Sequence, residues 1–238
     1  MANRLFFTGD THGDYEIRRL ASGAFRADDL DKDDYVVICG DFGLVFNPIQ
    51  SSGREEYWLR WLAKKPFTTL FVDGNHENFD RLDAMETETW HGGKVHRIND
   101  SVFHLMRGEM FDIAGRKIFA MGGARSHDIP FRTEGISWWQ QEMPSAEERA
   151  LAWQTLERHA WHADAVVTHC APANFQHALH ADYGNDEMTR FLFDVERKLS
   201  YGTWLFGHYH EDRWIGERAR AIYNDIVELL PDGTCVAR

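Results

Sequence analysis

Five short clusters of residues carry side chains that commonly bind metal ions. They are Gly9-Asp10-Thr11-His12-Gly13, Gly40-Asp41, Gly74-Asn75-His76-Glu77, Thr168-His169 and Gly207-His208-Tyr209-His210. Asp10 and His12 stand two residues apart, so a single turn can present both to one ion, and His208 and His210 have the same spacing. Carboxylate, amide oxygen and imidazole together suit Mn, Fe, Zn or Ni better than Ca, which prefers oxygen ligands alone. The clusters therefore predict a transition-metal site.

Each cluster directly follows a segment whose residues favour a buried β-strand. The strands are predicted at 5–8, 35–39, 68–72, 165–168 and 203–206. All five are continuous apolar runs, which are typical of a sheet covered on both faces. Predicted helices at 16–21 and 55–65 separate the first three strands and indicate right-handed βαβ units. Because ligands bind beyond the carboxyl ends of parallel strands, we expect all five clusters to meet at one edge.

The rest of the chain has a less regular middle and a β-rich tail. The expected elements are antiparallel strands within 102–121, a long loop over 125–145, a helix from Ser145 to about Trp161, a helix over 186–200 and antiparallel strands within 213–236. The loop has no clear period, and long ordered loops are often functional. The sequence contains no Pro- or Ser-rich linker, internal repeat or low-complexity tract. We therefore expect one domain over 1–238.

Charge and composition exclude several classes of protein. The 238 residues carry a formal net charge of −12, which disfavours binding of nucleic acid over the whole surface. Three widely spaced cysteines indicate a reducing compartment and no disulfide framework. No apolar run approaches the roughly 20 residues of a membrane span, and the first residues lack the apolar stretch of a signal peptide. We expect a cytoplasmic protein that does not bind membranes.

The five clusters, in this order, resemble the motifs of the calcineurin-like metallophosphoesterases, over a span from Gly9 to His210. The resemblance implies a four-layer α/β/β/α sandwich of two mixed sheets flanked by helices. It also implies two divalent ions at the sheet ends, with Mn expected and Fe, Zn or Ni as alternatives. The implied ligands are Asp10, His12, Asp41 and His210 for the first ion, and Asp41, Asn75, His169 and His208 for the second. His76 would be the catalytic histidine and not a ligand.

One departure from the family pattern bears on the branch. In the phosphoprotein phosphatases the second cluster continues as Gly-Asp-x-x-Asp-Arg-Gly, whereas this chain has Leu44 and Val45 at the positions of the second Asp and the Arg. The missing Asp pairs with the catalytic histidine in that branch, so the orienting partner of His76 is left open. The loop from Ser126 to Pro144 resembles that of phage and bacterial metallophosphoesterases instead.

The resemblance predicts a dimetal hydrolase of phosphate mono- or diesters. A metal-bridging hydroxide would attack phosphorus, and protonated His76 would act as general acid. Arg132 or Arg125 on the long loop would bind phosphate, with a solvated salt bridge as the alternative; Arg132 is preferred. The substrate would be a small phosphate ester or a phosphoprotein. One alternative is a nuclease of the same fold, which needs a basic cleft. Another is a non-catalytic protein-binding scaffold; such a scaffold should have lost ligands, yet all seven ligand positions are present.

Several other residues near the clusters have simpler explanations. Trp138 and Trp139 are adjacent on an extended segment and face opposite ways, so packing in the core is favoured over ligand contact for each. His127 is best explained as a surface histidine. Asp14 is either a helix N-terminal acid or a residue behind the metal ligands.

Overall fold

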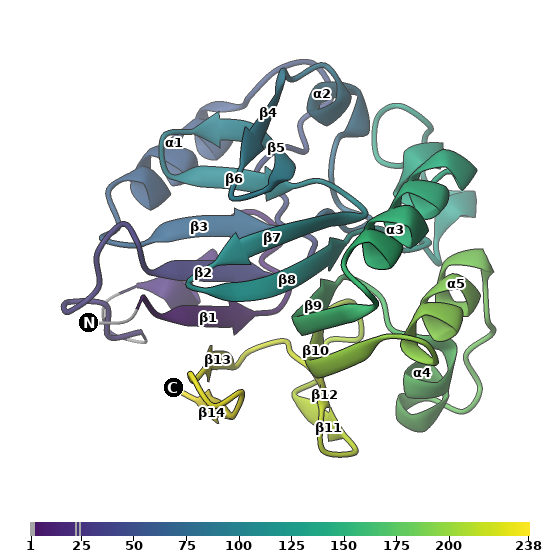
Figure 1. The fold of residues 1–238 in the computed structure, drawn as a ribbon. Helices are drawn as coiled ribbons and strands as arrows, with labels where there is room; N and C mark the ends of the chain where they lie inside the picture. Colours follow the sequence, from purple (N-terminus) through teal and green to yellow (C-terminus); the bar gives the residue numbers. More distant parts are fainter. Residues whose placement is uncertain (1–2, 22, 24) are drawn as a thin grey trace.

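The computed structural model describes residues 3–21, 23 and 25–238, within which fourteen strands form two mixed sheets (Figure 1). The strands are β1 (Leu5–Thr8), β2 (Tyr35–Ile38), β3 (Thr68–Phe71), β4 (Thr87–Trp90), β5 (Gly93–Asn99), β6 (Val102–Leu105), β7 (Glu109–Ile113), β8 (Arg116–Met121), β9 (His162–Thr168), β10 (Ser200–Phe206), β11 (Arg213–Ile215), β12 (Ala219–Ala221), β13 (Ile226–Leu229) and β14 (Cys235–Ala237). The helices are α1 (Gly53–Ala63), α2 (Phe79–Asp83), α3 (Ala146–Arg158), α4 (Ala173–Leu179) and α5 (Glu187–Glu196), with 3-10 turns at Ile17–Leu20, Ile129–Phe131 and Gln140–Glu142.

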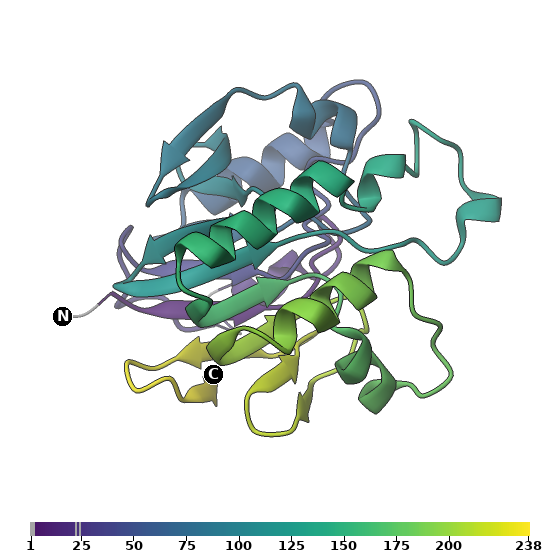
Figure 2. The same ribbon diagram turned by 45° about the vertical axis from the view of Figure 1, so that its right-hand side comes forward.

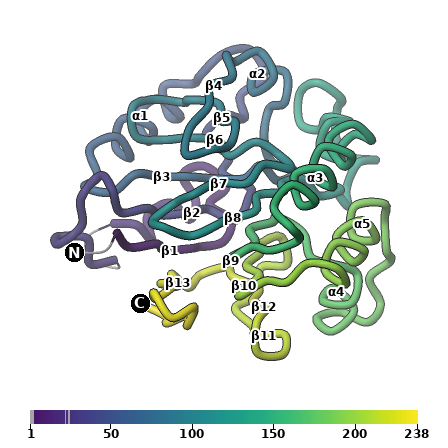
Figure 3. Tube along the Cα trace, in the orientation of Figure 1, coloured from purple at the N-terminus to yellow at the C-terminus, as the bar shows by residue number. Residues whose placement is uncertain are grey.

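The first sheet places three of the predicted strand ends side by side. Its strand order is β14-β13-β1-β2-β3-β6-β5-β4, and β1, β2, β3 and β6 run parallel. The second sheet has the order β11-β12-β10-β9-β8-β7, in which β8, β9, β10 and β12 run parallel. Figure 3 follows the chain from β3 through β4, β5 and β6 to β7 and β8, where it passes from the first sheet to the second.

The two sheets pack face to face and carry helices on their outer faces. Phe7 and Leu70 of the first sheet share a buried core with Val167 and Leu205 of the second. The preceding residue of β1, Phe6, points the other way and packs in the layer formed with α1; full burial of one such ring contributes about 1.5–3 kcal/mol. On the outer face of the second sheet lie α3, α4 and α5 (Figure 2). The predicted α/β fold, two mixed sheets with flanking helices, is confirmed.

Two local expectations were wrong, and one hairpin was not foreseen. The predicted helix at 16–21 is a short 3-10 turn, Ile17–Leu20. The hairpin of β4 and β5 was not foreseen, although its two-residue loop, His91 and Gly92, has positive φ at both positions as a type I′ turn requires. The strand β6 does not pair with β7; it lies in the first sheet between β3 and β5. β6 and β7 both end at the predicted turns, and only the pairing of β6 differs from the expectation.

Two further expectations concern a signal peptide and membrane-spanning helices. Met1 and Ala2, part of the segment expected not to be a signal peptide, lie outside the described residues. In the part of the chain that the structure describes, no helix is both long enough and apolar enough to span a membrane.

Candidate metal centre

The turns that follow five parallel strands converge on one site. Asp10 follows β1, Asp41 follows β2 and Asn75 follows β3, all in the first sheet. His169 follows β9 and His208 follows β10, in the second sheet. The carbonyl of Cys39 at the end of β2 accepts a hydrogen bond from His169 at 2.9 Å, so the two sheets meet at this point.

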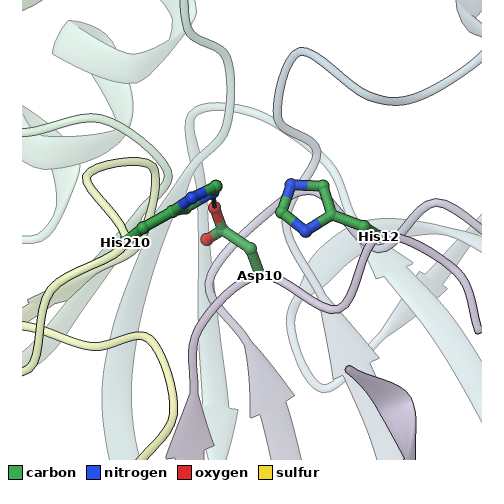
Figure 4. A group of neighbouring side chains, drawn as sticks. All are labelled: Asp10, His12 and His210. Atoms are coloured by element: carbon green, nitrogen blue, oxygen red, sulfur yellow. Dashed lines mark ion pairs between the residues drawn. The ribbon is translucent and has the colours of Figure 1, made fainter. Parts of the chain in front are cut away.

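Asp10 is fully buried and has an oxygen without a partner. Its Oδ1 accepts a hydrogen bond from the His208 amide at 3.0 Å. Its Oδ2 makes no hydrogen bond within the described residues, although His210 Nε2 lies 3.1 Å away. Figure 4 shows the rings of His12 and His210 on either side of this carboxylate. A buried carboxylate oxygen without a hydrogen bond is costly, and a bound cation would remove that cost.

Asp41 lies between the two halves of the site. Its Oδ1 accepts backbone hydrogen bonds from Asn75 and His76, each at 2.8 Å, and lies 3.3 Å from His169 Nε2. Its Oδ2 lies 3.4 Å from His12 Nε2. The side chain is 2 % exposed, so its charge is compensated by these groups and not by water.

Two ligand candidates are oriented by their other polar atoms. The Nδ1–H of His169 donates to the Cys39 carbonyl, which leaves Nε2 directed at Asp41 and, at 3.4 Å, at Asn75 Oδ1. Metal-binding histidines characteristically donate their second ring nitrogen to such an oxygen. The Asn75 amide in turn donates Nδ2 to Ser126 Oγ at 3.3 Å, so its Oδ1 faces His169. Both arrangements fit metal ligation.

Three sets of side chains can each present ligand atoms within 4.8 Å of one another. They are Asp10 with His12 and His210, His12 with Asp41 and His76, and Asp10 with Asp41 and His169. The predicted ligand His208 belongs to none of these sets within the described chain, but its ring contacts that of His169 edge to face at 4.9 Å. His76, expected to be no ligand, does fall in one set.

The backbone at the site adopts conformations that non-glycine residues rarely use. His12, Asp41, His208 and His210 all have positive φ, between 39° and 67°. Left-handed backbone in such residues costs free energy and is concentrated at functional sites. The neighbouring glycines allow close approach: a Cβ at Gly207 would lie 2.1 Å from Asp10 Oδ1, and one at Gly74 would lie 2.2 Å from Asp41 Oδ1.

Without an ion, protons balance the charge of the carboxylates. Burial acts to lower the pKa of His12, but Asp41 raises this pKa to about 9. Burial also acts to lower the pKa of His169, but Asp41 and Asp10 raise this pKa to about 10. Burial, reinforced by the charge of His169, lowers the pKa of His208 to about 3. The site thus takes up positive charge at two histidines, and binding of a metal would release those protons.

Asp73 and Glu77, the carboxylates near His76 in the sequence, have other partners. Asp73 accepts from Arg107 and His104. Glu77 is buried and accepts from the amides of Gly43 and Gly74 at 3.1 and 2.6 Å. Its carboxylate therefore joins the turns after β2 and β3.

His76 instead contacts the long loop. Arg132 donates from Nη2 to His76 Nε2 at 3.3 Å, from Nη1 to the Ser137 carbonyl at 3.1 Å, and pairs through Nε with Asp128 at 2.6 Å. The loop from 125 to 144 thus reaches the site, as its position after β8 indicated. The contact joins residues 56 apart in the chain, so no local spacing could have predicted it.

The structure also places the other residues near the clusters for which the sequence offered simpler explanations. Trp139 is 2 % exposed and donates Nε1 to Asp80 at 2.9 Å, so it packs in the interior. Trp138 is half-buried. His127 is exposed but stacks on His208 with ring centroids 5.5 Å apart, a closeness to the site that sequence reasoning missed. Asp14 pairs with Arg54 at the edge of the site.

The comparisons with known proteins agree with this geometry. The family model for calcineurin-like phosphoesterases matches residues 4–212, which is most of the chain and contains all five clusters. No curated protein matches the chain.

Proposed function

The chain belongs to the calcineurin-like phosphoesterase family, and we propose that it is a hydrolase of phosphate mono- or diesters that depends on two divalent ions. The observation that carries this proposal is the shared use of Asp10 and Asp41 by overlapping sets of ligand-type side chains. The Oδ2 of the buried Asp10, which accepts no hydrogen bond within the described residues and lies 3.1 Å from His210 Nε2, supports it.

The proposed ligands are those that the motifs imply. The first ion would be held by Asp10, His12, Asp41 and His210, and the second by Asp41, Asn75, His169 and His208. The contacts of Asp41 with both His12 and His169 support its role as the bridging ligand. A mixed set of carboxylate, amide and imidazole donors suits Mn, with Fe, Zn or Ni as alternatives.

When bound, a pair of divalent ions would activate water for attack on phosphorus and neutralise phosphoryl charge. His76 lies next to the ligand set and is proposed to protonate the leaving oxygen. Arg132 is proposed to bind the phosphoryl oxygens with its planar guanidinium. Its Nη2 is directed at His76, because Asp128 and the Ser137 carbonyl hold the other two nitrogens.

The contact between Arg132 and His76 links the proposed phosphate binding by Arg132 to the proposed acid role of His76. Burial lowers the pKa of His76, Arg132 lowers it further, and Asp41 opposes both. A guanidinium can only donate, so His76 Nε2 is the acceptor in this contact. A phosphate that draws the guanidinium away would free Nε2 and favour its protonation, which makes the acid available when substrate is bound.

We also propose the finer assignments that the sequence favours. These are the phage and bacterial branch of the family, because Leu44 and Val45 replace the Asp and Arg of the phosphoprotein phosphatases, a single domain over 1–238, and a cytoplasmic location. The proposed substrate is a small phosphate ester or a phosphoprotein.

The test is hydrolysis of mono- and diesters by Mn²⁺-loaded protein, with a His76→Ala variant. We expect His76→Ala to retain both ions and to lose about 10²–10⁴-fold in kcat. The loss should be smaller for nitrophenyl phosphate, whose leaving group needs less protonation. His177→Ala, at an exposed histidine of α4, is the matched control and should behave as wild type.

Two outcomes would contradict the proposal. Loss of bound metal from His76→Ala would make His76 a ligand, as its set with His12 and Asp41 allows. Absence of hydrolysis of every mono- and diester by the metal-loaded protein would favour a non-catalytic scaffold.

A further inference from the structure

A cavity of about 340 Å³ lies directly beside His76. It is lined by His12, Tyr15, Glu16, Gly43, Phe46 and His76, and we call it the ring pocket. An adjoining cavity of about 450 Å³ shares several of these residues and extends to Ile136 of the long loop. An engineered apolar cavity of about 150 Å³ holds benzene, so the ring pocket has room for an aromatic ring.

The side chains of the ring pocket that do not belong to the proposed catalytic set are mainly aromatic. Phe46 is half-buried, and its ring centroid lies 6.0 Å from that of His76. Tyr15 is 75 % exposed and lines the cavity, so its ring is accessible to a ligand bound there. Gly43 also lines the cavity; its φ is 69°, and a Cβ there would lie 2.4 Å from the Gly13 amide nitrogen, so the backbone needs glycine at this position.

The charges at the ring pocket disfavour a second phosphate or a nucleic-acid backbone there. Glu16 lines the cavity, and its Oε2 lies 3.2 Å from His12 Nδ1. The nearest guanidinium in the adjoining cavity, that of Arg54, is paired with Asp14. By contrast, the cavity of about 250 Å³ beside His208 is lined by Arg125, His127, Asn185 and other polar groups.

We propose that the ring pocket binds the leaving group of the substrate and that this leaving group carries an uncharged aromatic ring. This inference rests on the proposed function: if His76 protonates the leaving oxygen, the body of the leaving group must lie on the His76 side of the phosphorus. The groups available there are the rings of Tyr15 and Phe46, which favour stacked or edge-to-face contacts with another ring.

The experiment compares an aryl with an alkyl ligand. Binding of benzylphosphonate and butylphosphonate to Mn²⁺-loaded protein is measured by calorimetry, and benzyl and butyl phosphate serve as substrates because their alcohols have similar acidity. We expect about tenfold tighter binding of benzylphosphonate and a similar ratio in kcat/KM. Tyr15→Ala and Phe46→Leu should each reduce the ratio by about two- to tenfold. Phe46→Leu retains apolar volume against Trp139, which Phe46 contacts edge to face.

Tyr57→Ala is the matched control, because Tyr57 is an exposed tyrosine on α1 and lines neither cavity. It should leave the ratio unchanged. Equal affinities for the two phosphonates with equal kcat/KM for the two esters would overturn the inference and leave the proposed function standing. A retained aryl preference in binding, with no hydrolysis of these or of any other mono- or diester, would overturn the proposed function and with it the leaving-group role, and would leave only the binding of an aromatic ring in the pocket. An equal loss of preference in Tyr57→Ala would also overturn the inference.

Discussion

Two buried aspartates at neighbouring strand ends differ in how their charge is balanced. Asp41 follows β2 and is 2 % exposed; Asp73 follows β3 and is 1 % exposed. Asp73 is paired with the guanidinium of Arg107 through Nε at 2.8 Å and Nη2 at 2.5 Å, and with His104 at 3.0 Å. Among the described residues, the cationic partners that pair with Asp41 are the imidazoles of His12 and His169.

We interpret this difference as that between a structural carboxylate, Asp73, and a proposed metal ligand, Asp41. Arginine stays protonated at any ordinary pH, so the charge that balances Asp73 cannot be exchanged. Burial acts to raise the pKa of Asp73, yet Arg107 and His104 hold it far below its usual range. Burial also acts to raise the pKa of Asp41, but His169 and His12 hold it well below its usual range. Those imidazoles can lose their protons when a metal ion binds to the ring nitrogens in place of the protons.

Asp41→Asn should have the largest effect, namely loss of metal and of activity. The asparagine Oδ1 can still accept from the Asn75 and His76 amides, so the turn is retained while the bridging charge is lost. Changes behind metal ligands cost about 10–100-fold in affinity, and loss of a bridging ligand should exceed that range. Metal analysis by mass spectrometry checks this.

His210→Ala provides the control for Asp41→Asn. The His210 side chain is 48 % exposed and lies at the rim, so its loss should remove less metal than loss of the bridging charge. Two ions and full activity in Asp41→Asn would end the assignment of Asp41 as a bridging ligand.

Arg107→Ala should affect stability and not metal content. Arg107 is 6 % exposed, and its Nη2 also donates to the Gln141 carbonyl at 2.8 Å, which ties the turn after β3 to the base of the long loop. Removal of one partner from a buried ion pair costs about 3–5 kcal/mol, because the other charge is left uncompensated. Urea unfolding measures this loss.

The double variant Arg107→Met with Asp73→Asn sharpens the comparison. Because neither charge is then left alone, it should recover part of the stability lost in Arg107→Ala. If Arg107→Ala instead kept its unfolding free energy and lost metal as Asp41→Asn is expected to, Asp73 would belong to the metal centre.

The convergence of the five clusters could be predicted because each is a local pattern at the end of an apolar strand. Asp10 with His12, and His208 with His210, are visible as spacings, and parallel strands explain why the turns after them meet. The two-sheet architecture depended on the family resemblance, since apolar runs alone do not say which strands share a sheet. That is why β6 was placed beside β7.

The surroundings of the clusters depend on contacts between distant, non-periodic segments. Arg107 joins Asp73 from 34 residues away, and Ser126 reaches Asn75 from 51 residues away. Nothing in the sequence around Asp73 or Arg107 shows that these two residues pair with each other. The loop carrying Ser126 and Arg132 could be predicted to lie near the site, because it follows β8, but its individual contacts could not.

Arg132→Ala should have the smallest of the three effects and completes the comparison between the two arginines. Arg107 is held by a carboxylate that is 1 % exposed, whereas the Asp128 partner of Arg132 has a side chain 54 % exposed, so solvent screens that pair and its loss should change stability little. We expect kcat/KM to fall by about 10–150-fold, the equivalent of roughly 1.5–3 kcal/mol for a charge-assisted hydrogen bond, with metal content unchanged. Steady-state kinetics and metal analysis check both parts. Arg132→Lys keeps the charge but not the fork, so it should recover only part of the rate. Unaltered kinetics in Arg132→Ala on a good substrate would remove this arginine from the site and leave its contact with His76 as packing alone.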